Sequence, residues 1–182
     1  MELKEGYDKL GRPNKDVYFM NICFAISKRS LDLNTKHGCL FVDKEGGILS
    51  TGYNGPVRNS IDSEVPLMAP DKYDVLEHSE RNAIYQAARH GVSLKDSFVY
   101  VTGLPCLDCL RDIIQVGAKQ ITYGPLQSNM TETDDYLKRF DRIMRGINLP
   151  IRRFAFDRVV FEMNPGLKEI CDGRKQVYCE WQ

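Results

Sequence analysis

The sequence predicts a layered α/β fold built around a mixed β-sheet. Two observations carry this prediction. Two short apolar segments joined by a glycine-containing turn are typical of a β-hairpin, and after them strand-like and helix-like segments alternate along the chain. Hydrophobic residues make up 42% of the chain and charged residues 27%, which is the balance of an ordinary globular domain.

The first half of the chain predicts one helix, the hairpin and a long loop. Apolar residues at helical spacing predict a helix over residues 16–29, which ends in basic residues as helix C-termini prefer. Residues 37–43 and 47–53 are the two hairpin strands, and residues 44–47 form the turn between them. Residues 54–74 are rich in Pro, Asn and Asp and predict a loop whose length is typical of functional or mobile loops.

The second half of the chain predicts helices interleaved with strands. Glycine follows the first two of these helices, as expected at a helix C-terminus, and Thr131 or Thr133 is a candidate N-cap of the third. The predicted helices cover residues 78–90, 106–116 and 131–147, with a short one at 165–172. The predicted strands cover residues 97–102, 120–124 and 158–163.

Composition and charge argue against several function classes. Lys plus Arg and Asp plus Glu both total 25, so the formal net charge is zero and no overall basic field favours a long nucleic acid. No apolar segment has the length of a membrane span, and the polar N-terminus lacks the apolar region of a signal peptide. We therefore expect one cytoplasmic domain over residues 1–182, in which cysteines are buried thiols or metal ligands. The six cysteines are Cys23, Cys39, Cys106, Cys109, Cys171 and Cys179.

Two of the predicted helices begin with residues suited to metal chemistry. Cys106 and Cys109 are spaced C-x-x-C at a helix start, where one turn brings both sulfurs to the same side and the helix N-terminus favours thiolates. His78 lies at another helix start and is the natural third ligand. With one imidazole and two thiolates, zinc keeps an open position for water, which is typical of a catalytic site.

Glu80 lies two residues beyond His78, where it can reach a water at the open position without binding the metal. A carboxylate there can take the water proton and pass it to a leaving group, so Glu80 is the predicted catalytic residue. Pro105 stands directly before the first cysteine. The combined pattern, H-x-E followed by P-C-x-x-C, is the signature of zinc-dependent nucleobase deaminases.

Three other interpretations stay open. A structural zinc site would need a fourth ligand, for which His37 and Cys39 are the nearby candidates, although Cys39 is expected to face the core from a strand. A redox dithiol is the usual alternative for an isolated C-x-x-C motif. A zinc protein without activity, acting as a binding or assembly module, is the third, and Glu80 argues against it because such a site needs no proton shuttle.

The chain resembles the deoxycytidylate (dCMP) deaminases of the cytidine deaminase superfamily from about residue 20 to about residue 125. The motifs that carry the resemblance are SKRSLDLNTKHGCLFV, LSTGYNG, EHSERNAIYQAARHG and GLPCLDCLRDIIQVGAKQITY. The GYNG loop separates this family from deaminases of free nucleosides and of tRNA. The resemblance implies a three-layer cytidine-deaminase-like fold, with a mixed central sheet of about five strands flanked by helices, usually in homo-oligomers.

The resemblance also implies the chemistry of the site. His78, Cys106 and Cys109 would be the ligands of Zn²⁺, and a zinc-bound hydroxide would attack C4 of cytosine. Glu80 would shuttle the proton, so that uracil and ammonia leave. Ser79 replaces the alanine that is usual between the histidine and the glutamate, and we expect little effect from it.

Four further residues receive roles from the resemblance alone. Asn54, in GYNG, would hold the sugar, Arg29 would contact the phosphate, and Tyr123 would form a wall of the base pocket. Arg89 matches a position linked to regulation by dCTP and dTTP. Simpler explanations also exist, since Arg29 can be a solvated helix-end cation, Asn54 can serve the turn before a glycine, and Tyr123 can be core packing.

The expected activity is that of a hydrolase which deaminates dCMP, or a 5-substituted dCMP, to the corresponding dUMP. A deaminase acting on cytosine or adenine within single-stranded DNA or RNA, or on free nucleosides, is the alternative. A nucleic-acid substrate is favoured only by the C-terminal extension, residues 131–182, which the resemblance does not cover. Basic and aromatic side chains interleave there: Arg152, Arg153, Arg158, Lys168, Arg174 and Lys175 with Phe154, Phe156, Phe161 and Trp181.

Overall fold

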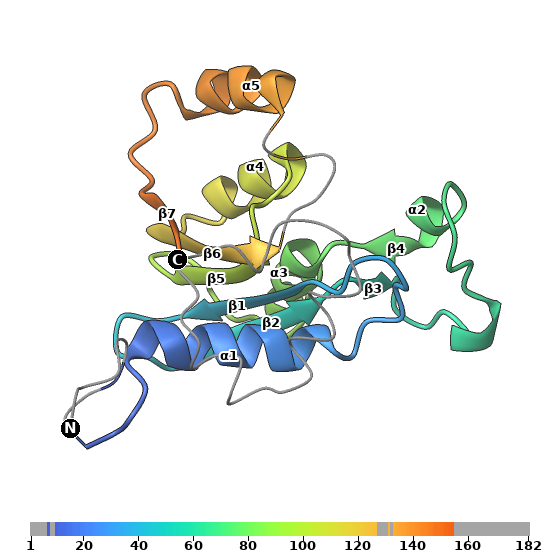
Figure 1. Cartoon of the computed structure of the whole chain (residues 1–182), viewed down its shortest axis with the longest axis horizontal. Helices are drawn as coiled ribbons and strands as arrows, with labels where there is room; N and C mark the ends of the chain where they lie inside the picture. The colour runs from blue at the N-terminus through green and yellow to red at the C-terminus, as the bar shows by residue number, and fades with distance from the viewer. Residues whose placement is uncertain (1–6, 8–9, 127–130, 132, 155–182) are drawn as a thin grey trace.

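The structure, a computed structural model, describes residues 7, 10–126, 131 and 133–154 (Figure 1). The strand predicted at 158–163 and the helix predicted at 165–172 lie outside the described residues. No helix in the described part of the chain combines the length and the apolar character needed to cross a bilayer.

A mixed sheet with five strands forms the middle layer, in the order β2-β1-β5-β6-β7. β1 pairs antiparallel with β2 and with β5, whereas β6 runs parallel to β5 and β7 runs parallel to β6. The predicted hairpin and the predicted mixed sheet are therefore confirmed. The strands are β1 (Gly38–Val42), β2 (Ile48–Tyr53), β5 (Phe98–Gly103), β6 (Gln120–Leu126) and β7 (Ile151–Arg153).

Helices cover both faces of this sheet, which confirms the three-layer fold (Figure 1). α1 lies on one face, and α3 and α4 lie on the other, with α5 packed on α4 farther out. The N-cap of α5 is Thr133, whose hydroxyl accepts the N–H of Tyr136 at 3.1 Å, so one of the two predicted caps is used. The helices are α1 (Lys15–Ser27), α3 (Ser79–Arg89), α4 (Leu107–Gln115) and α5 (Asp134–Met144).

The long loop predicted at 54–74 contains short elements that hydrophobic periodicity does not detect. β3 pairs antiparallel with β4, which brings the start of the loop beside the residues that precede α3. This pairing fixes the entry into α3 and hence the place of His78. The elements are β3 (Gly55–Pro56), the 3-10 helix η1 (Asp62–Glu64), α2 (Lys72–Val75) and β4 (Leu76–Glu77).

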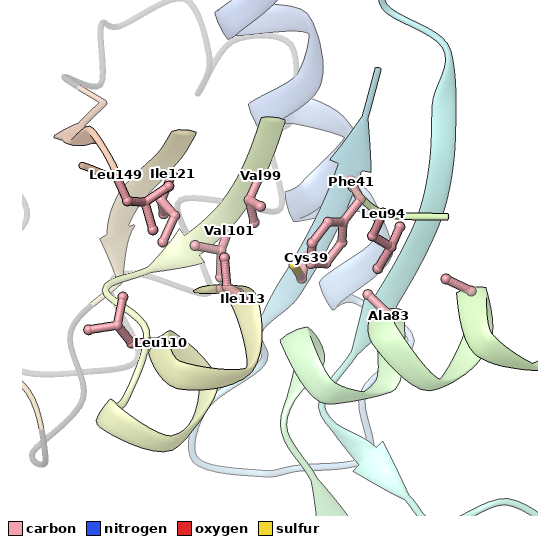
Figure 2. Close-up of a cluster of buried hydrophobic side chains, with 11 residues drawn as sticks. Cys39, Phe41, Ala83, Leu94, Val99, Val101, Leu110, Ile113, Ile121 and Leu149 are labelled. Carbon is pink, nitrogen blue, oxygen red and sulfur yellow. The ribbon is translucent and has the colours of Figure 1, made fainter. Parts of the chain in front are cut away.

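The core consists of two apolar clusters, one on each face of the sheet. β1 is buried along its whole length, so its alternate side chains enter opposite clusters. Leu40 packs with α1, whereas Cys39 and Phe41 pack with α3 and α4 (Figure 2). The expectation that Cys39 faces the core is therefore confirmed.

Gly52 sets the distance between α3 and the sheet. A Cβ atom at this position would lie 2.2 Å from the carbonyl oxygen of Ser79 and 2.4 Å from the amide nitrogen of Ala83. Glycine is thus required in β2 for α3 to pack this closely on the sheet. The hydroxyl of Ser50 adds a hydrogen bond to the carbonyl of Ala83 at 2.6 Å.

Candidate active site

The starts of α3 and α4 meet at one point. His78 is the N-cap residue of α3, and Cys106 is the N-cap residue of α4, where its sulfur accepts the N–H of Cys109 at 3.5 Å. Both N-cap residues have extended backbone dihedrals, so their side chains project beyond the helix ends. α4 follows directly after β5, at the edge of the sheet where ligand sites of α/β proteins are found.

His78, Cys106 and Cys109 form a compact three-donor group. The Nδ1 atom of His78 lies 3.4 Å from the sulfur of Cys106 and 3.5 Å from the sulfur of Cys109. All three donor atoms lie within 4.8 Å of one another. A tetrahedral zinc ion with bonds of about 2.3 Å to sulfur and about 2.0 Å to nitrogen separates such atoms by about 3.5 Å. The donor set and its spacing therefore fit Zn²⁺.

The three-donor group leaves room for a fourth ligand from solvent. His78 is exposed, Cys106 is half-buried and Cys109 is buried, so one side of the group faces water. Within the described residues, no fourth histidine, cysteine, aspartate or glutamate belongs to it. A site with three protein ligands and one accessible position is the arrangement of catalytic zinc.

The protonation states of the three donors are coupled. The hydrogen bond from Cys109, together with that from His78, outweighs burial and lowers the pKa of Cys106 to about 4. The hydrogen bond with Cys106 also raises the pKa of His78 to about 9 against the effect of burial. The same contact with Cys106 and burial raise the pKa of Cys109. Metal ligation needs deprotonated cysteines and a neutral histidine, so binding of a metal would release the protons that these side chains carry.

Glu80 lies in the first turn of α3, beside the three-donor group. Its side chain is almost fully buried, with 5% of the residue exposed, and the hydroxyl of Ser79 donates to its Oε2 atom at 2.8 Å. Burial raises the pKa of Glu80, although the charge of His78 and the hydrogen bond from Ser79 act in the opposite direction. A carboxylate of this kind is suited to take up and release a proton.

Two contacts of the site were not foreseen from the sequence. The hydroxyl of Ser79 orients the Glu80 carboxylate, although we expected little effect from this residue. Arg81 donates from Nε to Oδ2 of Asp112 at 2.9 Å and thereby joins α3 to α4. The pair Glu77 and Arg81 is visible from its i,i+4 spacing, but the bond to Asp112 spans 31 residues and has no sequence signal.

Asn54, predicted to hold the sugar, uses its amide within the protein. Its oxygen accepts the N–H of His37 at 2.7 Å, and its nitrogen donates to the carbonyl of Thr35 at 2.7 Å. The same nitrogen lies 3.4 Å from Oδ2 of Asp32. In the structure Asn54 thus anchors the segment that leads into β1, and its contact with the sugar stays a prediction.

Asp32 and Lys72 form a buried ion pair next to Asn54. The two Lys72 Nζ–carboxylate distances are 2.9 and 3.1 Å, and Asp32 also accepts the N–H groups of Asn34 and Thr35. We call Asp32, Asn54 and Lys72 the loop cluster. It ties the segment before β1 to α2 in the long loop.

Arg29, predicted as a phosphate contact, lines a pocket of about 530 Å³ on the β2 side of α3. Arg58 also lines it, so two arginines contribute to its walls, and Glu77, the residue before His78, is a lining residue as well. The three donors and Glu80 do not line this pocket. Its walls are Arg29, Leu31, Thr51, Gly52, Tyr53, Pro56, Val57, Arg58, Asn59, Ser60, Asp62, Glu77, Asn82, Tyr85 and Gln86.

The other two predicted residues lie in different surroundings. Tyr123 is a half-buried residue of β6 that packs against the cluster under α3 and α4. Arg89 is an exposed residue at the end of α3 and does not line the pocket of Arg29. The structure therefore brings together the predicted metal ligands and Glu80, whereas the roles assigned to Tyr123 and Arg89 stay predictions.

The family model described as "Cytidine and deoxycytidylate deaminase zinc-binding region" matches residues 13–125. The chain belongs to the cytidine and deoxycytidylate deaminase family. The match contains the whole hairpin, the three-donor group and Glu80, and the family predicted from the sequence motifs is confirmed. α5 and β7 lie beyond it.

Curated relatives of this chain are named deoxycytidylate deaminases. A probable deoxycytidylate deaminase of Drosophila melanogaster is 38% identical over 119 aligned positions, and the alignment covers 59% of this chain and 58% of the relative. The deoxycytidylate deaminase of Homo sapiens is 32% identical over 112 aligned positions, and the alignment covers 58% of this chain and 62% of the relative. The chain therefore spans less than two thirds of the length of these curated relatives.

Solved structures support the fold. The dCMP deaminase of the cyanophage S-TIM5 matches 79% of this chain and 99% of its own chain, with a TM-score of 0.57 and 24% identity. The structure of that protein with dCMP and dUMP matches 75% of this chain and 94% of its own, also with a TM-score of 0.57 and 23% identity. The predicted cytidine-deaminase-like fold is thereby confirmed.

Proposed function

We propose that the chain is a hydrolase that deaminates dCMP to dUMP and ammonia with the help of zinc. The observation that carries the proposal is the three-donor group of His78, Cys106 and Cys109, open on one side and flanked by the buried carboxylate of Glu80. The names of the curated relatives support the nucleotide as substrate. We further propose that residues 1–182 form a single deaminase domain.

His78, Cys106 and Cys109 would hold the zinc ion. When bound, zinc supplies a Lewis acid that makes water a nucleophile near neutral pH. The three side chains would leave one position free for that water, and their attachment to two helix starts would keep the geometry fixed while the reaction proceeds. The N-terminus of α4 would also favour the two cysteines as thiolates, because a helix N-terminus stabilises negative charge.

Glu80 would move the protons of the reaction. As water adds to C4 of the cytosine ring, the carboxylate of Glu80 would take one proton from that water and deliver it to N3 of the ring. It would then carry the proton of the new C4 hydroxyl to the amino group. The bond from C4 to the amino nitrogen then breaks, and ammonia leaves. Ser79 would hold the carboxylate through the 2.8 Å hydrogen bond to Oε2.

Residues outside the metal centre would bind the rest of the nucleotide. Arg29 would bind the phosphate, and its place in a pocket with a second arginine, Arg58, supports a role with an anionic group. Tyr123 would pack against the base. Asn54 would shape the sugar site through the segment that it anchors at Thr35 and His37, in addition to the direct contact predicted. Arg89 would belong to a regulatory site.

The expected assembly and location extend this proposal. We propose a homo-oligomer in the cytoplasm that acts on a small deoxynucleotide. Light scattering coupled to gel filtration would measure the mass of the assembly, and a mass of one chain would contradict the oligomer.

Most of the basic and aromatic residues that favour a nucleic-acid substrate lie outside the described residues: Phe156, Arg158, Phe161, Lys168, Arg174, Lys175 and Trp181.

A substrate panel tests the proposal. Zinc-loaded protein would be mixed with dCMP, 5-methyl-dCMP, deoxycytidine and a cytosine-containing single-stranded oligonucleotide, and ammonia release would be measured for each. We expect turnover of dCMP, with deoxycytidine slower because it lacks the phosphate. Turnover of only the oligonucleotide or only the nucleoside would keep the chemistry and overturn the substrate. Absence of ammonia from all four would overturn the activity.

A further inference from the structure

α5 contributes a side chain to the corner that carries the cysteines. The hydroxyl of Tyr136 donates to the carbonyl oxygen of Pro105 at 2.8 Å, across 31 residues of sequence. Tyr136 is 3% exposed, so this hydrogen bond is shielded from water. α5 lies over α4 on the side away from the sheet (Figure 1) and belongs to the segment beyond the family match.

The carbonyl of Pro105 has no partner within α4. The first intrahelical bond of α4 runs from the N–H of Leu110 to the carbonyl of Cys106 at 2.8 Å, so the carbonyl one residue earlier lies before the helix. Pro105 is buried, and a buried carbonyl requires a hydrogen-bond donor. Tyr136 supplies this donor from another helix.

The peptide that joins Pro105 to Cys106 orients the first cysteine. Its plane sets the direction in which the side chain of Cys106 leaves the backbone, and therefore the place of the sulfur. From within α4, the N–H of Cys109 donates to that sulfur at 3.5 Å. A hydrogen bond that fixes the carbonyl of this peptide restrains the sulfur from outside α4.

We propose that Tyr136 is a positioning residue for the metal centre, acting through the Pro105–Cys106 peptide. This inference rests on the proposed function, because it takes Cys106 to be a zinc ligand. It assigns α5 a role in holding the site, in addition to packing on α4. Partners that orient metal ligands without touching the metal typically change metal affinity about 10- to 100-fold when they are lost.

The test compares two tyrosine-to-phenylalanine variants of the full chain. Tyr136→Phe removes the hydroxyl and keeps the ring. Tyr100→Phe is the matched control, because Tyr100 is 6% exposed and its hydroxyl donates to Oδ1 of Asp16 at 2.7 Å, on the face of the sheet covered by α1. Each zinc-loaded protein is mixed with excess chromophoric chelator, and the rate of zinc release is recorded. We expect Tyr136→Phe to release zinc about ten-fold faster, and Tyr100→Phe to match the wild type.

A cobalt-substituted protein gives a second readout that a merely structural role would not change. The absorption bands of Co²⁺ bound to thiolates report the geometry of the ligands. We expect these bands to shift in Tyr136→Phe and to keep their position in Tyr100→Phe. Thermal unfolding of both variants controls for the loss of a buried hydrogen bond, which is common to the two.

A second pair of variants keeps the test decisive if Tyr136→Phe does not fold. Thr133→Ala removes the N-cap of the α5 turn that carries Tyr136, and Asn14→Ala removes the N-cap of α1, whose oxygen accepts the N–H of Val17 at 2.9 Å. We expect faster zinc release from Thr133→Ala than from Asn14→Ala.

The outcomes separate the two proposals. Wild-type protein that retains no zinc would overturn the proposed function and this inference with it. Wild-type protein that holds zinc, together with equal release rates for Tyr136→Phe and Tyr100→Phe, would overturn the role of Tyr136 and leave the proposed function intact.

Discussion

The three-donor group and the loop cluster each bring three polar side chains together, but the loop cluster is buried whereas the three-donor group includes the exposed His78. In the loop cluster, the carboxylate of Asp32 meets Lys72 and two backbone N–H groups, and the amide of Asn54 meets backbone partners on both sides. In the three-donor group, the donor atoms of His78 and the two cysteines lie within 4.8 Å of one another, and His78 is exposed. A catalytic zinc site needs a position for water. A buried charge whose partners all belong to the protein instead stabilises the fold.

The largest expected effect is the loss of zinc from the three-donor group when one of its cysteines is removed. Cys106→Ala leaves two protein ligands, which do not hold zinc firmly, so we expect zinc and turnover to be lost together. Cys23→Ala is the control, because Cys23 is fully buried in the cluster under α1. Metal analysis after dialysis measures the outcome, and full zinc retention by Cys106→Ala would contradict the assigned ligand.

The next effect tests the carboxylate beside the metal ligands. Glu80→Gln keeps the size of the side chain and removes its ability to carry a proton, so we expect turnover to fall about 10²- to 10⁴-fold while zinc is retained. Glu64→Gln, in the exposed 3-10 helix η1, is the control. Steady-state kinetics together with metal analysis gives the result, and near-full activity of Glu80→Gln would refute the proton shuttle.

For the loop cluster we expect a loss of stability without a loss of metal. Lys72→Met leaves Asp32 buried without its cation, which we expect to lower the free energy of unfolding by about 3 kcal/mol. Lys119→Met breaks an exposed ion pair with Asp96 and should cost less than about 1 kcal/mol. Urea unfolding of zinc-loaded proteins measures both. A variant of Lys72 that loses zinc without losing stability would remove the distinction between the clusters.

The same ion pair predicts a pH dependence. Burial raises the pKa of Asp32, but the hydrogen bond from Lys72 and those from Asn34 and Thr35 outweigh it, so the pKa in the folded protein lies below its ordinary value. The pair therefore stabilises the fold above about pH 4, and this contribution is lost as the pH falls through the lowered pKa. We expect the stability difference between wild type and Lys72→Met to shrink in acid, measured by urea midpoints at neutral and acidic pH.

The smallest effect concerns the hydroxyl that orients Glu80. Ser79→Ala removes one hydrogen bond, worth about 1 kcal/mol, so we expect turnover to fall about five-fold with zinc unchanged. Ser97→Ala is a matched control, since Ser97 is also fully buried and donates to the carbonyl of Leu94 at 2.6 Å. Equal turnover of the two variants would contradict a catalytic effect of the Ser79 hydroxyl.

Local patterns in the sequence predict most of this fold. Periodicity and glycine signals place α1, α3, α4, α5 and the long strands within a few residues of their observed bounds, whereas α2 and η1 lie in the segment predicted as a loop. β7 has three residues, and β3 and β4 have two each, which is too short for any periodic signal. Their pairing depends on neighbours in space that the sequence does not reveal.

In the candidate site, too, some residues could be predicted from the sequence and others could not. The spacing of the cysteines and of His78 and Glu80 predicts the three-donor group and its carboxylate, because each pair lies within a single helical turn. The bonds of Arg81 to Asp112 and of Tyr136 to Pro105 each span 31 residues and depend on how the helices pack. Sequence patterns therefore indicate the reacting groups, whereas the residues that hold them in place require the structure.

The most direct test of the central claim is a titration of zinc-free protein with Zn²⁺ in which the deamination of dCMP is followed by its change in ultraviolet absorption. An open three-donor group beside Glu80 predicts that activity rises linearly and reaches a plateau at one zinc ion per chain. Protein that binds one zinc ion per chain and leaves dCMP unchanged would contradict a catalytic zinc site for this nucleotide.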